Sequence, residues 1–226
     1  MEKLPAYIYL VFGATLFLAL LFFYKATGNS KKVLLLISIW IGLQTIVSLA
    51  GFYTITDSIP PRVTLLILPP VILIIGLFIS KKGKRFIDKL DIKTLTLFHI
   101  IRVPVELVLF WLFINKAVPG LMTFEGRNFD ILSGLSAPFI YYFGFVKKKL
   151  GTSFLLVWNL ICLLLLFNIV INAILSVPTS FQKFAFEQPN IAILYFPFVL
   201  LPACLVPLVL FSHLAAIRQL LTKKSD

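Results

Sequence analysis

Residues 153–176, SFLLVWNLICLLLLFNIVINAILS, form an apolar run that contains no charged side chain. An α-helix rises about 1.5 Å per residue, so about 20 apolar residues are enough to cross a hydrocarbon core of about 30 Å. The run exceeds that length and therefore predicts a transmembrane helix. It decides the fold class because similar runs recur on both sides of it along the chain.

The composition of the whole chain agrees with this interpretation. Of the 226 residues, 60% are hydrophobic and 13% are charged, and the mean hydropathy is +1.01; soluble domains are roughly 45–50% apolar and 25% charged. Short polar connections separate the apolar runs and leave no stretch for a soluble domain. We therefore expect one all-α, polytopic membrane domain over residues 1–226, a seven-transmembrane-helix bundle. Its expected spans are residues 4–24, 33–54, 62–80, 95–115, 129–146, 153–176 and 190–215.

The basic residues are distributed unevenly between alternate connections. Fifteen of the 21 Lys and Arg residues lie in connections on one side of the expected bundle, five lie on the other, and Arg102 lies within the fourth span. Short basic loops stay in the cytoplasm, so we expect the N-terminus outside and the C-terminus in the cytoplasm, in a plasma or inner membrane. The expected cytoplasmic set is Lys25, Lys31, Lys32, Lys81, Lys82, Lys84, Arg85, Lys89, Lys93, Lys147, Lys148, Lys149, Arg218, Lys223 and Lys224, and the outer set is Lys3, Arg62, Lys116, Arg127 and Lys183.

The same bias accounts for the formal net charge of +12. We therefore expect the lipid bilayer, and no nucleic acid, as a partner. The first span lacks a small-residue cleavage site, and more cations follow it than precede it, which predicts an uncleaved first helix. Cys162 and Cys204 lie inside apolar runs without CxxC spacing, so they are expected to be core residues.

The fourth span carries three ionisable residues on one face. At 100° per residue, His99, Arg102 and Glu106 fall within a sector of about 60°. A central charge costs roughly 2.5–3.5 kcal/mol on insertion scales, so this face is expected to point into the bundle or a hydrated cavity. We expect Arg102 and Glu106 to pair at i, i+4, beside the carbonyl of Ile100 that Pro104 leaves without its helical donor.

Two polar residues of other spans are expected at matching depths. Counted at 1.5 Å per residue, Gln44 of the second span lies level with Glu106, and Asn159 of the sixth lies near the level of Arg102. The candidate ligand- or ion-binding set is therefore Arg102, Glu106, His99, Gln44 and Asn159.

The two histidines of the chain, His99 and His213, are both expected near the inner face on different helices. Two such histidines are a candidate pair of ligands for a b-type haem. A hydrogen-bonding or interfacial role is the alternative. The sequence indicates no other metal site and leaves the cofactor unknown.

The outer connection over residues 119–130 concentrates polar residues next to glycines. One interpretation is a lid or an outer ligand contact. The alternative is that Asn128 or Asp130 caps the fifth helix while Glu125 and Arg127 pair at the surface.

Enzyme signatures such as H-E-x-x-H and G-x-S-x-G are missing from the sequence. The leading hypothesis is a protein that binds or translocates a small polar or anionic solute, an ion or a proton. Arg102 would supply a fixed positive charge, Glu106 a titratable group and His99 a relay to the cytoplasm. The alternatives are a membrane sensor or partner-binding subunit whose buried charges fix helix packing, and a lipid-modifying enzyme with Glu106 as the base.

Overall fold

The computed structural model describes residues 4–222, and over these residues the protein is helical without β-strands. The expected all-α class is confirmed. The α-helices are α1 Ala6–Ala26, α2 Lys31–Leu49, α3 Thr64–Ile79, α4 Lys81–Asp88, α5 Ile92–Phe98, α6 Arg102–Ile114, α7 Ile131–Tyr141, α8 Thr152–Ile174 and α9 Val206–Thr222. The shorter turns are η1 Phe52–Thr54, η2 His99–Ile101, η3 Gly120–Met122, η4 Tyr142–Val146, η5 Ala192–Leu194 and η6 Leu201–Leu205; η4 and η6 are π-helical and the others are 3₁₀-helical.

The helices of residues 4–222 include five that are long and apolar enough to cross a membrane. α3 is shorter and meets α4 at an angle of 92°, and α7 with η4 forms another shorter apolar helix, Ile131–Val146. This arrangement is compatible with a multi-pass integral membrane protein. The five long helices are Ala6–Ala26, Lys31–Leu49, Ile92–Ile114, Thr152–Ile174 and Leu201–Thr222.

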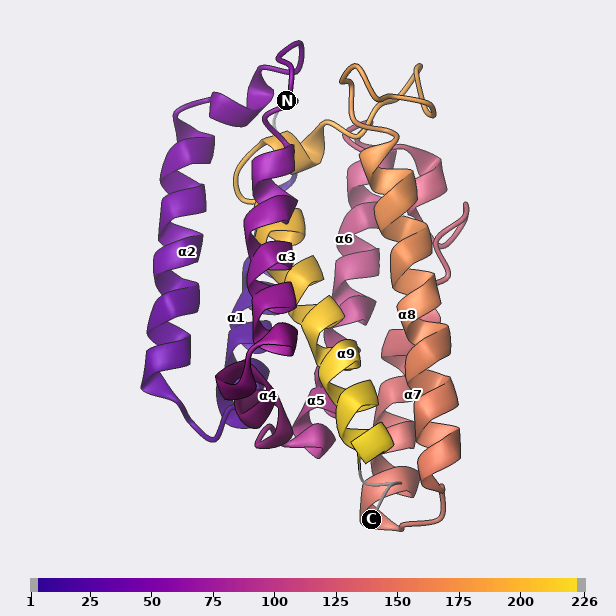
Figure 1. The fold of residues 1–226 in the computed structure, drawn as a ribbon. Coiled ribbons are helices and arrows are strands. Elements are labelled where there is room, and N and C mark those ends of the chain that lie inside the picture. Colours follow the sequence, from indigo (N-terminus) through magenta and orange to yellow (C-terminus); the bar gives the residue numbers. More distant parts are fainter. Residues whose placement is uncertain (1–3, 223–226) are drawn as a thin grey trace.

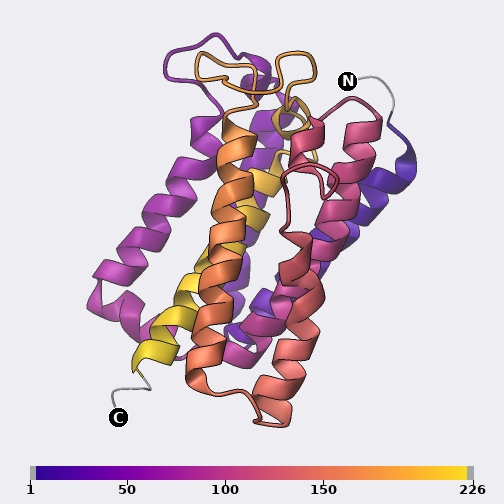
Figure 2. The same cartoon turned by 90° about the vertical axis from the view of Figure 1, so that its right-hand side faces the viewer.

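The long helices run roughly side by side, so the molecule is an elongated bundle (Figures 1 and 2). α1 packs on α5 and α6, and α8 packs on α9, while α2 lies at the edge of the bundle. α1 begins at one end of the bundle and α9 ends at the other (Figure 1). The α1–α2 connection, α4, the α7–α8 connection and the end of α9 share one end, here called the basic end because most Lys and Arg residues lie there. Lys3, Lys223 and Lys224 lie outside the described residues.

The seventh expected span, residues 190–215, is wrong at both ends. Its first part holds only the turn η5, and the continuous helix begins at Leu201 and extends to Thr222. Tyr195 has extended backbone angles after η5, and Pro197 has no N–H to extend a helical ladder, so an apolar composition is not sufficient for a helix there.

Prolines explain two irregular places in the long helices. Pro104 has no N–H to donate to the carbonyl of Ile100. The helix of the fourth span is wound more tightly there, as the 3₁₀-helical turn η2. Pro207 likewise leaves the carbonyl of Ala203, inside η6, without its helical donor. The indole Nε1 of Trp40 donates to that carbonyl at 2.8 Å, which joins α2 to the irregular start of the last span.

α4 turns across the basic end and is held there by α9. A Cβ on Gly83 would overlap the carbonyl oxygen of Leu77, so the sharp corner requires glycine. The guanidinium of Arg218 donates two hydrogen bonds to Asp88, both at 2.9 Å. The amide of Gln219 donates to two backbone carbonyls, that of Ile87 in the last turn of α4 and that of Leu90 just after the helix.

Candidate functional site

The connection between α6 and α7 turns into the bundle. Met122, Thr123 and Asn128 are fully or almost fully buried, and Asp130 is only 5% exposed. Hydrogen bonds hold this segment: the backbone N–H of Asp130 donates to Oδ1 of Asn128 at 3.0 Å, and Nδ2 of Asn128 donates to the carbonyl of Met122 at 3.0 Å. Residues 122–130 therefore bring three polar side chains into the interior, those of Thr123, Asn128 and Asp130, while Glu125 is exposed.

Arg102 is buried, as the sequence predicts, with 3% of its surface exposed. The expected partner is wrong. Its Nη1 atom lies 2.8 Å from Oδ1 of Asp130 and 3.5 Å from the carbonyl of Cys162, and the ion pair is with Asp130 instead of Glu106. Asp130 precedes the first residue of α7, but its carboxylate makes no capping bond to that helix and pairs with Arg102.

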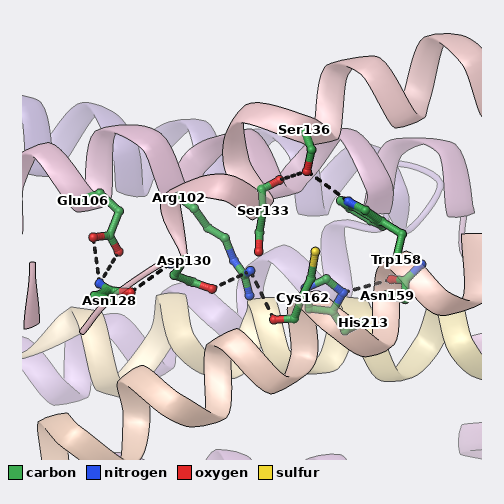
Figure 3. A network of polar contacts seen from close by, with 10 residues as sticks. All are labelled: Arg102, Glu106, Asn128, Asp130, Ser133, Ser136, Trp158, Asn159, Cys162 and His213. Carbon is green, nitrogen blue, oxygen red and sulfur yellow. Dashed lines mark hydrogen bonds and ion pairs between the residues drawn. The ribbon is translucent and has the colours of Figure 1, made fainter. Parts of the chain in front are cut away.

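Glu106 is also buried, at 2% exposure, and has a different partner. Nδ2 of Asn128 lies 2.6 Å from one carboxylate oxygen of Glu106 and 2.7 Å from the other. Arg102, Glu106, Asn128 and Asp130 are called the buried polar site from here on. They form two linked pairs, because Asn128 also binds the backbone of Asp130 (Figure 3).

The two histidines lie together on the basic-end side of Arg102. The rings of His99 and His213 are stacked, with centroids 3.8 Å apart and planes inclined by 9°. Nδ1 of His213 lies 2.9 Å from Oδ1 of Asn159, and Nδ2 of Asn159 donates to the carbonyl of Leu155 at 2.9 Å. Trp158 packs against both rings, at centroid distances of 5.8 and 5.9 Å. Asn159 therefore lies next to His213.

This histidine geometry does not fit a b-type haem held between the two rings. In a haem with two histidine ligands, the imidazole rings bind one iron from opposite faces of the flat macrocycle. Each ring points a nitrogen at the iron, and the macrocycle lies between the two rings. Here the rings are in face-to-face contact and leave no space between them for a porphyrin. Separately from haem, residues 4–222 contain no group of three or more His, Cys, Asp or Glu residues that could hold a metal ion.

Gln44 does not join the site. It lies on α2, where its Oε1 atom accepts a hydrogen bond of 2.6 Å from the hydroxyl of Tyr53. α2 is at the edge of the bundle, away from α6 in Figure 1. Gln44 was expected near Glu106 because the two residues lie at the same depth along their helices. Equal depth does not indicate which helices are neighbours.

Several buried polar atoms near Arg102 have no hydrogen-bond partner among the described residues. They are Nε and Nη2 of Arg102, both ring nitrogens of His99 and Nε2 of His213. Buried polar atoms in proteins are usually satisfied by protein, water or a ligand. These atoms lie on Arg102 and on the two histidines beside it, so the unpaired donors and acceptors are concentrated in this part of the interior.

A cavity of about 310 Å³ adjoins the buried polar site. Its walls come mainly from α3, α6, α8 and α9. Arg102, Glu106 and Asp130 are the ionisable residues in its lining, and nearly all other lining side chains are aliphatic. The cavity surface is therefore almost entirely apolar, and the three ionisable side chains lie buried behind one part of its lining.

The sequence indicated the ionisable residues of the fourth span but did not indicate that Asn128 and Asp130 are their partners. The concentration of polar residues at 119–130 was the available signal. It did not distinguish a surface loop from one that enters the bundle, since both are polar and glycine-rich.

Comparison with known proteins identifies a family to which the chain is similar. A family model described as "Domain of unknown function (DUF8737)" matches residues 59–221, which include the buried polar site, both histidines and the cavity. No curated protein matches the chain significantly, and neither does any solved structure. The chain therefore belongs to the DUF8737 family, which carries no assigned function.

Proposed function

We propose that this protein is a seven-span membrane protein, with its N-terminus outside and its C-terminus in the cytoplasm, that binds or translocates a ligand at the buried polar site. The proposed spans are α1, α2, α3, α5 with α6, α7, α8 and α9. An odd number of crossings agrees with the opposite positions of the start of α1 and the end of α9 (Figure 1). The concentration of cations at the basic end supports a cytoplasmic position for that end.

Impermeant labels test this topology in intact cells. We expect an impermeant amine reagent to leave Lys31, Lys81 and Lys148 unmodified until the membrane is permeabilised. A cysteine introduced by Glu125→Cys or Phe186→Cys, at exposed positions of the other end, should react with an impermeant maleimide without permeabilisation. Modification of both sets from the same side of the membrane would contradict the proposed orientation.

The observation that carries the functional proposal is the incomplete pairing of Arg102. A guanidinium has five N–H donors; Arg102 is buried and uses Nη1 for Asp130, while Nε and Nη2 have no partner in the described residues. If Arg102 served only to join helices, its N–H groups would be expected to donate to protein acceptors. The free donors and the adjacent Glu106 carboxylate together support binding of a polar group that both accepts and donates hydrogen bonds.

The ion pair with Asp130 changes the role proposed for Arg102. Because Asp130 neutralises Arg102, the site has no excess positive charge for a permanent anion. With Glu106 ionised the three groups sum to a charge of −1, and with Glu106 protonated they sum to zero. This balance favours an uncharged polar group, a cation or a proton over the anionic solute suggested by the sequence.

Native mass spectrometry of the detergent-purified protein tests the proposal, with an absorption spectrum taken on the same sample. We expect a retained small-molecule mass and no Soret band, since the stacked rings leave no space for a porphyrin between them. A bare protein that co-purifies with a second polypeptide would overturn the ligand-binding proposal in favour of a partner-binding subunit.

A further inference from the structure

We infer that the ligand of the buried polar site is a bilayer-resident, single-chain amphiphile with an uncharged, hydrogen-bonding oxygen head, which reaches the site sideways between α3 and α8. This inference rests on the proposed function and adds the class of ligand. Its basis is the shape and chemistry of the cavity beside Arg102.

The cavity is built for a largely apolar body. Its walls are aliphatic side chains such as Ile67, Val71, Leu166 and Val170, with charge confined to the wall at the buried polar site. A water-soluble polar solute would have to lose its hydration against these side chains and gain few hydrogen bonds in return. An amphiphile instead places its chain against the aliphatic walls and its head against Arg102.

The cavity is accessible from the lipid-facing surface. Leu68 of α3 and Ile174 of α8 both line it, and they are 52% and 39% exposed on the outside of the bundle. Residues of η6 and α9 also line the cavity, and α9 lies between α3 and α8 in Figure 1. A molecule dissolved in the bilayer can therefore reach the buried polar site without passing through water.

The volume of about 310 Å³ limits the size of the ligand. It lies at the lower end of the roughly 300–1,000 Å³ found for small-molecule sites. One chain with a small head suits this space, whereas a phospholipid with two chains and a large headgroup exceeds it.

The charges around the cavity restrict the head. A permanently anionic head would bring the sum over Arg102, Asp130 and Glu106 to −1 or −2 in a region of low dielectric constant, where uncompensated charge is costly. An uncharged hydroxyl adds no charge. Its oxygen can accept a hydrogen bond and its proton can be donated, so it can pair with the buried polar site that adjoins this part of the cavity lining.

Photolabelling of the purified full-length protein with a hexadecanol analogue carrying a diazirine on its chain tests this inference. We expect labelled peptides from α3 and α8, and loss of labelling when 1-hexadecanol is added in excess. Hexadecyl sulfate, which has the same chain with a fixed anionic head, should compete at least tenfold less well.

Variants separate the cavity from general lipid contact. Val170→Trp fills the cavity and should reduce competable labelling at least tenfold, whereas Leu164→Trp, on the exposed outer face of the same helix, should leave it unchanged. Ile67→Phe fills the same space from α3 and gives an independent test if Val170→Trp does not fold. Equal labelling of the cavity variants and Leu164→Trp, or equal competition by hexadecyl sulfate, would overturn the inference.

The outcome also distinguishes this inference from the proposed function. A wild-type protein that retains a water-soluble ligand and shows no competable photolabelling would refute the amphiphile and support a ligand-binding site. A protein with neither retained ligand nor competable labelling would refute both.

Discussion

Replacing Asp130 by leucine is expected to destabilise the protein by roughly 3–5 kcal/mol, the usual cost of removing one partner of a buried ion pair. The reason is that the substitution leaves the guanidinium of Arg102, 3% exposed, without its carboxylate 2.8 Å away. Thermal unfolding in detergent measures the effect. Asp57→Leu is the matched control because Asp57 is exposed in the described structure.

The double variant Arg102→Met with Asp130→Leu should recover most of this loss, since it removes both charges from the interior. The size of the recovery gives the coupling free energy between the two residues. If Asp130→Leu unfolds at the same temperature as Asp57→Leu, the ion pair does not exist in the folded protein.

Replacing Asn128 by leucine is expected to cost roughly 3 kcal/mol or more, because hydrogen bonds to charged groups contribute about 1.5–3 kcal/mol each. The change removes the donor to both carboxylate oxygens of Glu106, the bond to the carbonyl of Met122 and the acceptor for the backbone of Asp130. We expect the inward segment at 122–130 to become susceptible to limited proteolysis in addition to a lower melting temperature.

Asn115→Leu is the control for that substitution. Asn115 is exposed at the end of α6, and its amide binds only the local carbonyl of Trp111. Equal stability and equal proteolysis of the two variants would show that the segment carrying Asn128 does not enter the bundle.

The long apolar helices could be located closely from hydropathy alone. Residues 153–176 were expected to be helical, and α8 extends over Thr152–Ile174. The last span was misplaced because Pro197 and the extended Tyr195 interrupt an apolar stretch. Hydropathy reports which residues avoid water, and it does not report whether the backbone there can continue its hydrogen bonds.

The buried polar site could be predicted only in part. The burial of Arg102 and Glu106 followed from their position in an apolar helix, where charge must face the interior. Their partners could not be predicted, because Asn128 and Asp130 come from a segment whose inward path depends on tertiary packing. Asn159 was expected near Arg102, and its contact with His213 depends on how α8 meets α9.

The difference between a ligand site and a structural ion pair is tested most directly by Glu106→Gln, with melting temperature and retained small-molecule mass measured on the same preparation. Glutamine has nearly the same shape and can still accept a hydrogen bond from Asn128. We predict a melting temperature close to that of the wild type, with loss of the retained ligand, and an unchanged ligand in the distant control Gln44→Leu. A Glu106→Gln protein that unfolds or aggregates, or that folds and keeps the ligand at the wild-type level, would contradict it.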